Sequence, residues 1–391
     1  MKGEKILFVT WDGPNVNYLE NLFLPIFKGL QIKYGHQFHI IQFIWDAEEV
    51  VKSREKLFES AGMKYLAIPV KRRFPKLGLI LAKLTGSAFI KRYISSHQIS
   101  VLMPRATTSM GIVKGIAKKT GIKLLFDADG FSQDERVDFN GLSKDSMQYR
   151  LYRKTEQRGF QEAASIICRS EKAKTIITER AGIGFDLTKV FVVHNGTFVP
   201  KPKKNGQKKQ TCSLVYAGSI GPQYRFTEMI GIYQQVKSEF PSARLTILTV
   251  QKEAAINLLQ KSFPGLEYEV TIKSVSPEDV HGELCKHHIG VSLRQRAFSM
   301  LGVAPIKVSE YLAAGLGIIY SPGIGDLDDI LREKPFAYCW NGFPENDSLN
   351  HWVEKQMKED FREDILALAL AWFSLDKTVW IYHQALQYGG E

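Results

Sequence analysis

The chain has 391 residues, of which 44% are apolar and 24% charged, and its formal net charge is +11. This length is typical of two domains, and the composition excludes a disordered, collagen-like or coiled-coil chain. No apolar run reaches the ~18 residues of a membrane-spanning helix, and the N-terminus lacks the apolar core of a signal peptide. The four cysteines are widely spaced and form no metal or redox motif, so we expect reduced thiols in a cytoplasmic protein.

The excess of positive charge lies in the first half of the chain. Residues 1–200 hold 31 basic and 19 acidic residues, whereas residues 201–391 hold 21 and 22. Residues 51–100 alone hold 11 basic and 2 acidic residues. We therefore expect a basic first domain to approach an anionic partner, which is a membrane surface, a nucleic acid or a phosphorylated substrate.

Short apolar runs alternate with longer amphipathic stretches through the first half, as strands alternate with helices. The predicted strands are residues 5–10, 37–44, 64–68, 100–103, 123–127, 165–168 and 190–194. The predicted helices are residues 18–34, 47–61, 76–95, 107–119, 145–162 and 171–180. This order predicts βαβ units and a mostly parallel sheet.

The alternation stops at residues 200–210, a polar stretch with proline and glycine that we interpret as a linker. It then resumes with predicted strands at residues 213–217, 244–248, 268–272, 289–293, 317–320 and 336–339. The predicted helices of this half are residues 225–239, 252–261, 277–286, 307–314 and 326–331. The tail, residues 360–391, is predicted to be helical and to pack back toward the first domain.

These elements predict an α/β protein with two Rossmann-like domains. The first domain spans residues 1–199, and the second spans residues 211–359. Ligands of such sheets bind outside the carboxyl ends of the strands, so the cleft between the two domains is the expected site.

Several motifs resemble those of GT-B glycosyltransferases, and of glycosyltransferase family 4 in particular. Residues 214–225, LVYAGSIGPQYR, resemble the first strand and glycine turn of the donor domain. Residues 304–319, APIKVSEYLAAGLGII, resemble the family motif that runs Pro, Lys, Glu-Tyr-Leu-Ala. Residues 126–138 and 192–197 resemble acceptor-domain segments. The resemblance implies a GT-B fold and transfer of a sugar from a nucleotide diphosphate sugar, with retention of the anomeric configuration.

One carboxylate and one lysine have a spacing that suits a nucleotide sugar. Glu310 follows Lys307 by three residues, so both lie on one face at the start of a predicted helix, after Pro305. A carboxylate can accept from both ribose hydroxyls, while Lys307 and the free amides from Gly302 to Ile306 can neutralise a diphosphate. The resemblance also implies that Glu310 binds ribose. An ordinary solvated ion pair is the alternative.

A glycine turn supplies further candidates for diphosphate binding. It follows a predicted strand and precedes a predicted helix, and it contains Gly218, Ser219 and Gly221. Glycine lets the backbone approach a phosphate closely. The resemblance matches Arg225 to a basic position that pairs with the diphosphate, where it would stabilise the charge of the leaving group. Arg294 and Arg296 leave a strand at its carboxyl end and are secondary candidates.

Two loops of the first domain supply candidates for the acceptor side. Asp12 and Gly13 follow the first predicted strand, and Asp127, Asp129 and Gly130 end another strand at the same edge. Strand alternation would direct the two later aspartates to opposite faces unless the chain turns there. One of them could orient an acceptor hydroxyl or act as a base. Carboxylates that cap the following segment are the alternative.

The sequence departs from the family pattern at one position. Many family members carry a second glutamate eight residues before the ribose-binding one, and Gly302 occupies that position here. Asp127 and Asp129 have the letters of an Asp-x-Asp metal motif but lie on the acceptor side. The resemblance implies protein cations instead of a metal, and no cofactor apart from the nucleotide sugar as co-substrate.

Residues 72–92 mix lysine and arginine with bulky apolar residues, as segments that bind anionic lipid headgroups do. We therefore expect a cytoplasmic glycosyltransferase, peripheral on the membrane, that acts on a glycan or lipid-linked acceptor in cell-envelope polysaccharide synthesis. One alternative is a catalytically inactive relative that serves as an assembly subunit. A nucleic-acid-binding protein is less favoured because no such motif is present, and an oxidoreductase lacks its G-x-G-x-x-G fingerprint.

Overall fold

The computed structural model describes residues 3–13, 16–70, 75–200, 211–342 and 346–389, without the side chains of residues 75–84 and 346–347. The described chain divides into two compact units. The N-terminal unit comprises Met1–His194, Leu301–Val303 and Asp376–Glu391, and the C-terminal unit comprises Asn195–Met300 and Ala304–Leu375. The predicted linker lies outside the described residues, apart from Pro200.

A parallel sheet forms the centre of the N-terminal unit. Its strands are β1 (Lys5–Trp11), β2 (Gln37–Ile44), β3 (Lys64–Pro69), β4 (Val101–Pro104), β5 (Lys123–Asp129), β6 (Ser165–Cys168) and β7 (Val190–Val192). They pair in the order β3-β2-β1-β4-β5-β6-β7, with Lys5 of β1 opposite Gln37 of β2. The central strands are continuous apolar runs, such as Ile6 to Val9, because both faces of the sheet are covered.

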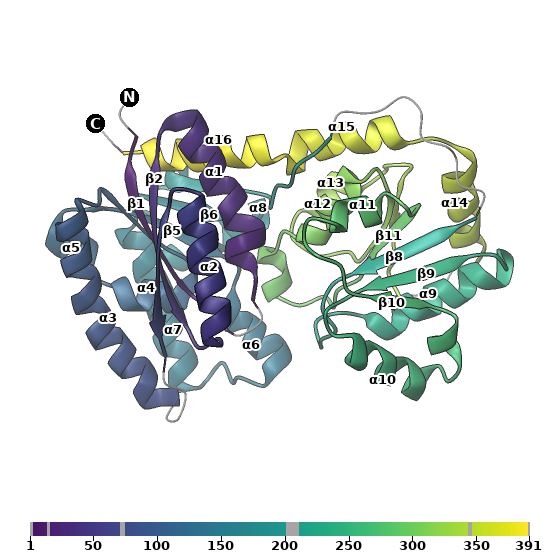
Figure 1. The fold of residues 1–391 in the computed structure, drawn as a ribbon, viewed down its shortest axis with the longest axis horizontal. Helices are drawn as coiled ribbons and strands as arrows, with labels where there is room; N and C mark the ends of the chain where they lie inside the picture. The colour runs from purple at the N-terminus through teal and green to yellow at the C-terminus, as the bar shows by residue number, and fades with distance from the viewer. Residues whose placement is uncertain (1–2, 14–15, 71–74, 201–210, 343–345, 390–391) are drawn as a thin grey trace. The chain divides into compact units, whose positions relative to one another are not determined.

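Helices cover both faces of this sheet, with α1 and α2 on one side of β1 and β2 and α3, α4 and α5 on the other (Figure 1). The helices of the unit are η1 (Leu19–Phe23, a π-helix), α1 (Leu24–Tyr34), α2 (Glu48–Ser60), α3 (Pro75–His97), α4 (Ala106–Val113), α5 (Ile116–Thr120), α6 (Ser132–Asn140), α7 (Met147–Glu162), α8 (Glu171–Ala181), η2 (Leu187–Lys189) and α16 (Leu375–Gln387). None of the helices in the described ranges is long and apolar enough to cross a bilayer.

The second half of the chain repeats the plan with a parallel sheet of its own. Its strands are β8 (Ser213–Ala217), β9 (Arg244–Leu248), β10 (Thr271–Lys273), β11 (Ile289–Ser292), β12 (Gly317–Tyr320) and β13 (Ala337–Cys339), in the order β10-β9-β8-β11-β12-β13. Its helices are α9 (Phe226–Glu239), α10 (Lys252–Ser262), η3 (Leu266–Tyr268), α11 (Val280–Leu284), η4 (Ser299–Gly302), α12 (Ile306–Ala313), α13 (Leu327–Leu331), α14 (Asn346–Lys358) and α15 (Arg362–Phe373).

The predicted α/β class with two Rossmann-like domains is confirmed, and a few elements differ from the prediction. The helix predicted over residues 107–119 is two helices, because Gly115 takes a left-handed conformation (φ 70°) before α5. The strand predicted over residues 268–272 is displaced to β10, because the turn η3 occupies its first residue. The sequence analysis did not predict α6 and α14.

The helical tail ends on the N-terminal unit. α15 packs against α12, whereas α16 packs on the N-terminal sheet and its helices. Lys123 Nζ donates to the Leu386 carbonyl at 2.6 Å, and Ser165 Oγ donates to the Ala385 carbonyl at 2.7 Å. A Cβ at Gly29 of α1 would lie 2.5 Å from Val379, so glycine lets α1 and α16 approach closely.

Candidate functional site

Both sheets have the strand order of doubly wound folds, which bind ligands at the carboxyl edge where the winding changes direction. In the C-terminal unit this point lies between β8 and β11, which pair directly. In the N-terminal unit it lies between β1 and β4. Among the residues singled out in the sequence, Asp12 and Gly13 follow β1, whereas the glycine turn and Arg294 follow β8 and β11.

A buried tyrosine fixes α12 against the edge formed by β8 and β11. The Ala217 N–H donates to Tyr311 Oη at 2.7 Å, and Tyr311 Oη donates to the Val291 carbonyl at 3.4 Å. Gly290 makes room for the ring, because a Cβ there would collide with it. The first turn of α12 is therefore held at the carboxyl edge of the sheet.

Lys307 and Glu310 form an ion pair on that first turn. Lys307 Nζ lies 2.8 Å from Glu310 Oε2, and the two side chains are 37% and 23% exposed. Pro305 is the extended residue that precedes the helix, and Ile306 is its first residue. The structure places the predicted lysine and carboxylate together and within reach of solvent.

A small hollow joins Lys307 to the ends of β8 and β11. It is lined by Tyr216, Ala217, Tyr224, Val291, Ser292, Leu293, Arg294, Pro305 and Lys307. The Arg294 guanidinium lies over the Tyr224 ring, with Cζ 4.8 Å from the ring centroid. The backbone N–H of Arg294 donates to Ser321 Oγ at 2.9 Å, which holds the main chain at this position.

The glycine turn after β8 is tied to the strand that precedes it. Tyr216 Oη donates to the Ser219 carbonyl at 2.6 Å. Neither Gly218 nor Gly221 has a left-handed φ, so the backbone conformation of the turn does not require glycine. The use of glycine here lies in its small size, which leaves the backbone open to close approach.

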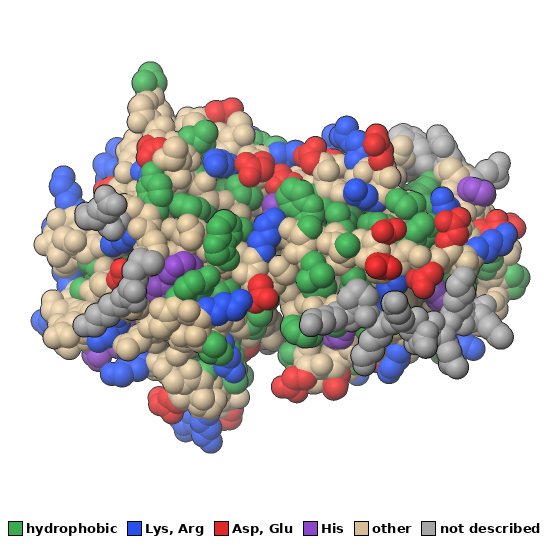
Figure 2. All heavy atoms as spheres, turned by 90° about the horizontal axis from the view of Figure 1, so that it is seen from above, with side chains coloured by type: hydrophobic (Ala, Val, Ile, Leu, Met, Phe, Trp, Pro, Cys, Tyr) green, Lys and Arg blue, Asp and Glu red, His purple; other side chains and the backbone are tan. Residues whose placement is uncertain are grey.

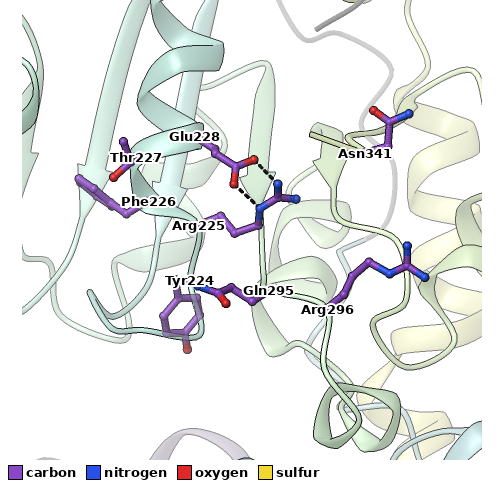
Figure 3. Close-up of a pocket in the computed structure, with 8 residues that line it drawn as sticks. All are labelled: Tyr224, Arg225, Phe226, Thr227, Glu228, Gln295, Arg296 and Asn341. Carbon is purple, nitrogen blue, oxygen red and sulfur yellow. Dashed lines mark hydrogen bonds and ion pairs between the residues drawn. The ribbon is translucent and has the colours of Figure 1, made fainter. Parts of the chain in front are cut away.

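A pocket of about 560 Å³ adjoins the hollow, and Tyr224 lines both. Its lining is Tyr224, Arg225, Phe226, Thr227, Glu228, Gln295, Arg296 and Asn341 (Figure 3). Arg225 Nε donates to Glu228 Oε1 at 2.5 Å, and Trp340 Nε1 donates to Glu228 Oε2 at 3.1 Å. Arg296 forms no ion pair with the described residues. The pocket therefore holds one anchored and one uncompensated arginine.

Gly302 belongs to the short segment that is counted with the N-terminal unit. A Cβ at this glycine would lie 2.7 Å from the Phe131 ring. The Phe131 ring is itself buried and lies 4.6 Å from the Arg180 Cζ. A glutamate at Gly302, as in the resembling family, would have to displace this ring.

A second charged cluster lies at the carboxyl edge of the N-terminal sheet. Arg105, which follows β4, donates from Nη1 to Asp12 Oδ1 at 3.1 Å and from Nη2 to Asp129 Oδ2 at 2.7 Å. Asp12 also accepts from Thr10 and Gln42, and it is 5% exposed. Asp12 is therefore saturated by the protein itself.

Asp127 is fully enclosed, whereas Asp129 reaches the surface. Asp127 has no exposed surface and accepts from Arg169 Nη2 at 2.7 and 2.9 Å. Asp129 is 28% exposed and accepts from Arg169 Nε at 3.2 Å. The chain turns between the two aspartates, through a β-bulge and a left-handed φ of 58° at Asp129, so both point at Arg169. This geometry favours Asp129 over Asp127 as the group that a substrate can reach.

The charge balance of this cluster keeps Asp129 ionised. Burial alone would raise the pKa of Asp129, but the Arg105 and Arg169 charges outweigh it and hold the pKa below its usual value. Gly130 and Gly13 flank the cluster, and a Cβ at Gly13 would lie 3.4 Å from Trp45. Asp129 is therefore suited to accept a hydrogen bond from a hydroxyl near neutral pH.

The sequence analysis missed the two arginines that organise the N-terminal cluster. Arg105 directly follows β4 and Arg169 directly follows β6. This is the same position, just past the end of a buried strand, that singled out Arg294 in the second half. Applied to both halves, the rule would have found them. In the described part of the chain, no three His, Cys, Asp or Glu side chains are placed to hold a metal ion.

The sequence matches no known family model and no curated protein at a significant level. The fold, in contrast, is similar to that of several solved glycosyltransferases. HepE from Anabaena, in complex with UDP and glucose, has a TM-score of 0.70 at 12% identity over 98% of this chain and 99% of its own. A glycosyltransferase from Rickettsia africae has a TM-score of 0.69 at 13% identity, with coverage of 99% and 100%.

The lipopolysaccharide outer core galactosyltransferase WaaB, in its apo form, is a third similar structure. Its TM-score is 0.66 at 14% identity, with 98% of this chain and 99% of that chain covered. At this level of identity the likeness concerns the fold. The chain has the GT-B fold, with two parallel-sheet α/β units and a helical C-terminal tail.

Proposed function

We propose that the protein is a glycosyltransferase that moves a sugar from a nucleotide diphosphate sugar to a hydroxyl of a glycan or lipid-linked acceptor. The observation that carries the proposal is the grouping of cations and one carboxylate at the β8/β11 edge. Arg225, Arg294, Arg296 and Lys307 line two adjoining cavities there, and Glu310 is paired to the lysine. Cations at the carboxyl edge of a doubly wound sheet are typical of a phosphate site.

The proposed mechanism is electrostatic assistance to departure of the nucleoside diphosphate. Negative charge grows on the diphosphate as the glycosidic bond breaks, and Arg225 and Lys307 are placed to stabilise it. Glu310 accepts hydrogen bonds from the ribose hydroxyls. The acceptor hydroxyl attacks on the face that the diphosphate leaves and gives its proton to the departing diphosphate oxygen, so the anomeric configuration is retained. Protein cations carry this charge, and we propose that no metal is required.

On the acceptor side, Asp129 is proposed to orient the acceptor hydroxyl, next to the loops that contain Asp12, Gly13 and Gly130. The partial exposure of Asp129 supports this role, since Asp12 and Asp127 are enclosed by protein. Envelope polysaccharide synthesis is proposed as the pathway, on the family resemblance of the motifs.

A peripheral position on an anionic membrane is proposed for the basic region, residues 51–100. Arg72 and Arg73 lie outside the described residues, and the Lys76 side chain is not described. Arg54 contributes nothing to such a surface, because it is 2% exposed and paired with Glu20 and Asp46. The proposal therefore concerns α3 and the segment before it.

A catalytically inactive assembly subunit is the second candidate. One observation favours it, namely that the Phe131 ring leaves no space for a side chain at Gly302, where the resembling family has a glutamate. Such a protein would bind a nucleotide without turning over its sugar.

Turnover of nucleotide sugars separates the two candidates. The purified protein is incubated with UDP-glucose, UDP-galactose or UDP-N-acetylglucosamine and a hydroxyl-bearing glycolipid such as octyl β-glucoside, in parallel samples with and without EDTA. We expect UDP release and an α-linked product by NMR with at least one donor. UDP binding without release supports the inactive subunit, and loss of activity in EDTA contradicts the metal-free mechanism.

A further inference from the structure

The charged cluster of the N-terminal unit extends to the C-terminal helix. Tyr382 of α16 donates its hydroxyl hydrogen to Asp127 Oδ2 at 2.6 Å and accepts from Arg169 Nη1 at 3.2 Å. Arg169 links Tyr382 to Asp129, because its Nε donates to Asp129 Oδ1. Tyr382, Arg169 and Asp127 are all at most 2% exposed, whereas Asp129 reaches solvent. The network therefore connects one accessible carboxylate to a buried tyrosine of the helix near the end of the chain.

We propose that Tyr382 and Arg169 are positioning residues that hold Asp129 where it can orient an acceptor hydroxyl. The inference deepens the proposed transferase function and rests on it. Neither residue touches substrate. Arg169 is buried between two aspartates and the tyrosine. The buried Tyr382 hydroxyl is hydrogen-bonded to Asp127 and Arg169 and is closed to solvent.

The backbone of Asp129 needs such support. Its φ of 58° is left-handed, a conformation that costs free energy for a residue with a Cβ and persists only where the surroundings hold it. The Asp129 N–H donates to Asp127 Oδ1 at 3.1 Å, so Asp127 fixes the backbone while Arg169 and Arg105 fix the carboxylate. Asp127 itself is oriented by Arg169 and Tyr382.

The Tyr382 hydroxyl acts as a hydrogen-bond donor to Asp127. Burial raises the pKa of Tyr382 well above its usual value, so the hydroxyl keeps its hydrogen. The Arg169 guanidinium uses Nη2 for Asp127, Nε for Asp129 and Nη1 for the tyrosine. Without the hydroxyl, Nη1 loses this partner and Asp127 Oδ2 loses its shortest bond. The guanidinium is then free to turn away from Asp129.

The position of Tyr382 also gives the C-terminal helix α16 a role in this cluster. α15 belongs to the C-terminal unit, and the chain enters the N-terminal unit again at Asp376, at the start of α16. Thr378 Oγ1 donates to the His194 carbonyl at 3.3 Å, one turn before Tyr382. The last helix thus supplies a residue to the acceptor-side cluster of the first unit.

The test compares two tyrosine hydroxyls at the end of the chain. Tyr382→Phe removes the buried one. Tyr388→Phe is the matched control, because Tyr388 Oη also donates to a carboxylate, that of Asp186 at 2.9 Å, but on the exposed surface. The Asp129 carboxyl is titrated by NMR on protein labelled with [γ-¹³C]aspartate, and its signal is assigned with Asp129→Asn. UDP affinity and the rate of transfer from UDP-glucose to octyl β-glucoside are measured on the same samples.

We expect Tyr382→Phe to raise the Asp129 titration midpoint and to lower the transfer rate about tenfold, as a misplaced group does, with UDP affinity unchanged. Tyr388→Phe should leave all three at the wild-type values. An Asp129 midpoint that is equal in the two variants overturns the inference. If Tyr382→Phe loses its native circular dichroism spectrum, Arg169→Lys is measured by the same criteria.

Failure of the proposed function is recognised separately. A wild-type protein that turns over no nucleotide sugar contradicts the transferase assignment and the acceptor role of Asp129 with it. The titration does not depend on turnover, so it still decides whether Tyr382 and Arg169 hold the Asp129 carboxylate.

Discussion

Glu310 and Lys307 neutralise one another across the first turn of α12, at the point where β8 and β11 end. A surface ion pair of this kind adds little to stability, with about 0–1 kcal/mol as the usual range. Its position beside two cavities is what suggests a role. Substitution should therefore affect donor binding far more than folding.

We predict that Glu310→Ala abolishes donor turnover while the melting temperature stays within a few degrees of wild type. Glu310→Gln should be partly active, because an amide accepts on only one oxygen. Glu354→Ala is the matched control, since Glu354 forms an exposed pair with Lys358 in the same half of the chain. Steady-state kinetics with varied donor measure the effect. Wild-type kinetics in Glu310→Ala would remove the ribose assignment.

Arg225→Ala and Lys307→Ala are each expected to lower kcat/KM by about 10²–10³, the usual effect of removing one preorganised stabilising donor. The loss should persist in EDTA. Arg244→Ala at the start of β9, on the opposite edge of the sheet, should be neutral. Equal rates for Arg225→Ala and Arg244→Ala would exclude Arg225 from the reaction.

At this scale, the sequence predicted the cations and the carboxylate of the C-terminal unit because a motif and strand ends marked them. It did not predict Tyr311 or Tyr382, because their roles depend on contacts between residues far apart in the chain. Tyr311 contacts β8 and β11, and Tyr382 is hydrogen-bonded to Asp127, from which it is separated by 255 positions in the sequence. No local pattern carries such information.

Among the elements, buried parallel strands were predicted most closely, since a strand covered on both faces is a continuous apolar run. β2, β6, β8, β9 and β12 have the predicted bounds. α6 was missed because its sequence, SQDERVDFN, is almost entirely polar and shows no helical period. Gly115 divides a predicted helix because its backbone is left-handed. The periodicity of apolar residues does not reveal such a backbone conformation.

A histidine pair lies where α16 packs against the rest of the N-terminal unit. His36 Nδ1 accepts from the Glu4 N–H at 2.9 Å, so its Nε2 carries the hydrogen and donates to His383 Nδ1 at 3.0 Å. The His383 ring stacks on the Tyr34 ring, with the two ring centroids 3.6 Å apart. Burial, with the neighbouring His383, lowers the pKa of His36 to about 4, and burial lowers that of His383. Both rings are therefore bound in the neutral form.

The pKa of His36 is lower in the folded protein than in the unfolded chain, where it is near 6.5. The neutral His36 ring therefore contributes its full stability above pH 6.5, and this contribution is lost as the pH falls toward 4. We predict that the unfolding free energy falls by about 1–2 kcal/mol between pH 7 and pH 5 on account of His36. His36→Gln should flatten that part of the urea-denaturation profile, whereas His351→Gln, on α14, should not. A wild-type profile that is flat from pH 7 to pH 5 would contradict the neutral pair.

Across the whole molecule, the two units carry different charge, and the basic one is proposed to meet a membrane. Lysine and arginine side chains are scattered among apolar ones on the face of the N-terminal unit seen in Figure 2, and those of the described residues form no dense basic patch there. Residues 51–100 hold 11 basic and 2 acidic residues, an excess of nine positive charges over fifty residues. This region is the part of the surface to test.

We predict that the protein sediments with anionic vesicles at low salt and is released at about 0.5 M salt, since each lysine or arginine near the bilayer adds about 1 kcal/mol within a Debye length. Reversal of Arg72, Arg73 and Lys76 to glutamate should abolish sedimentation and leave UDP binding unchanged. Reversal of Lys52 and Lys56 on α2 serves as a control that also replaces positive with negative charge. Sedimentation that survives the triple reversal would make the cluster an ordinary solvated surface.

The most direct test of the central claim is a calorimetric titration of the wild-type protein and of Arg225→Ala with UDP, with ADP and GDP as alternative ligands. The claim is that the β8/β11 edge of the C-terminal unit binds a nucleoside diphosphate. We predict one site per chain for at least one nucleotide, in buffer with EDTA, and a loss of affinity of about tenfold or more in Arg225→Ala. If none of the three nucleotides binds, or if Arg225→Ala binds as tightly as wild type, the assignment of this edge as the donor site is wrong.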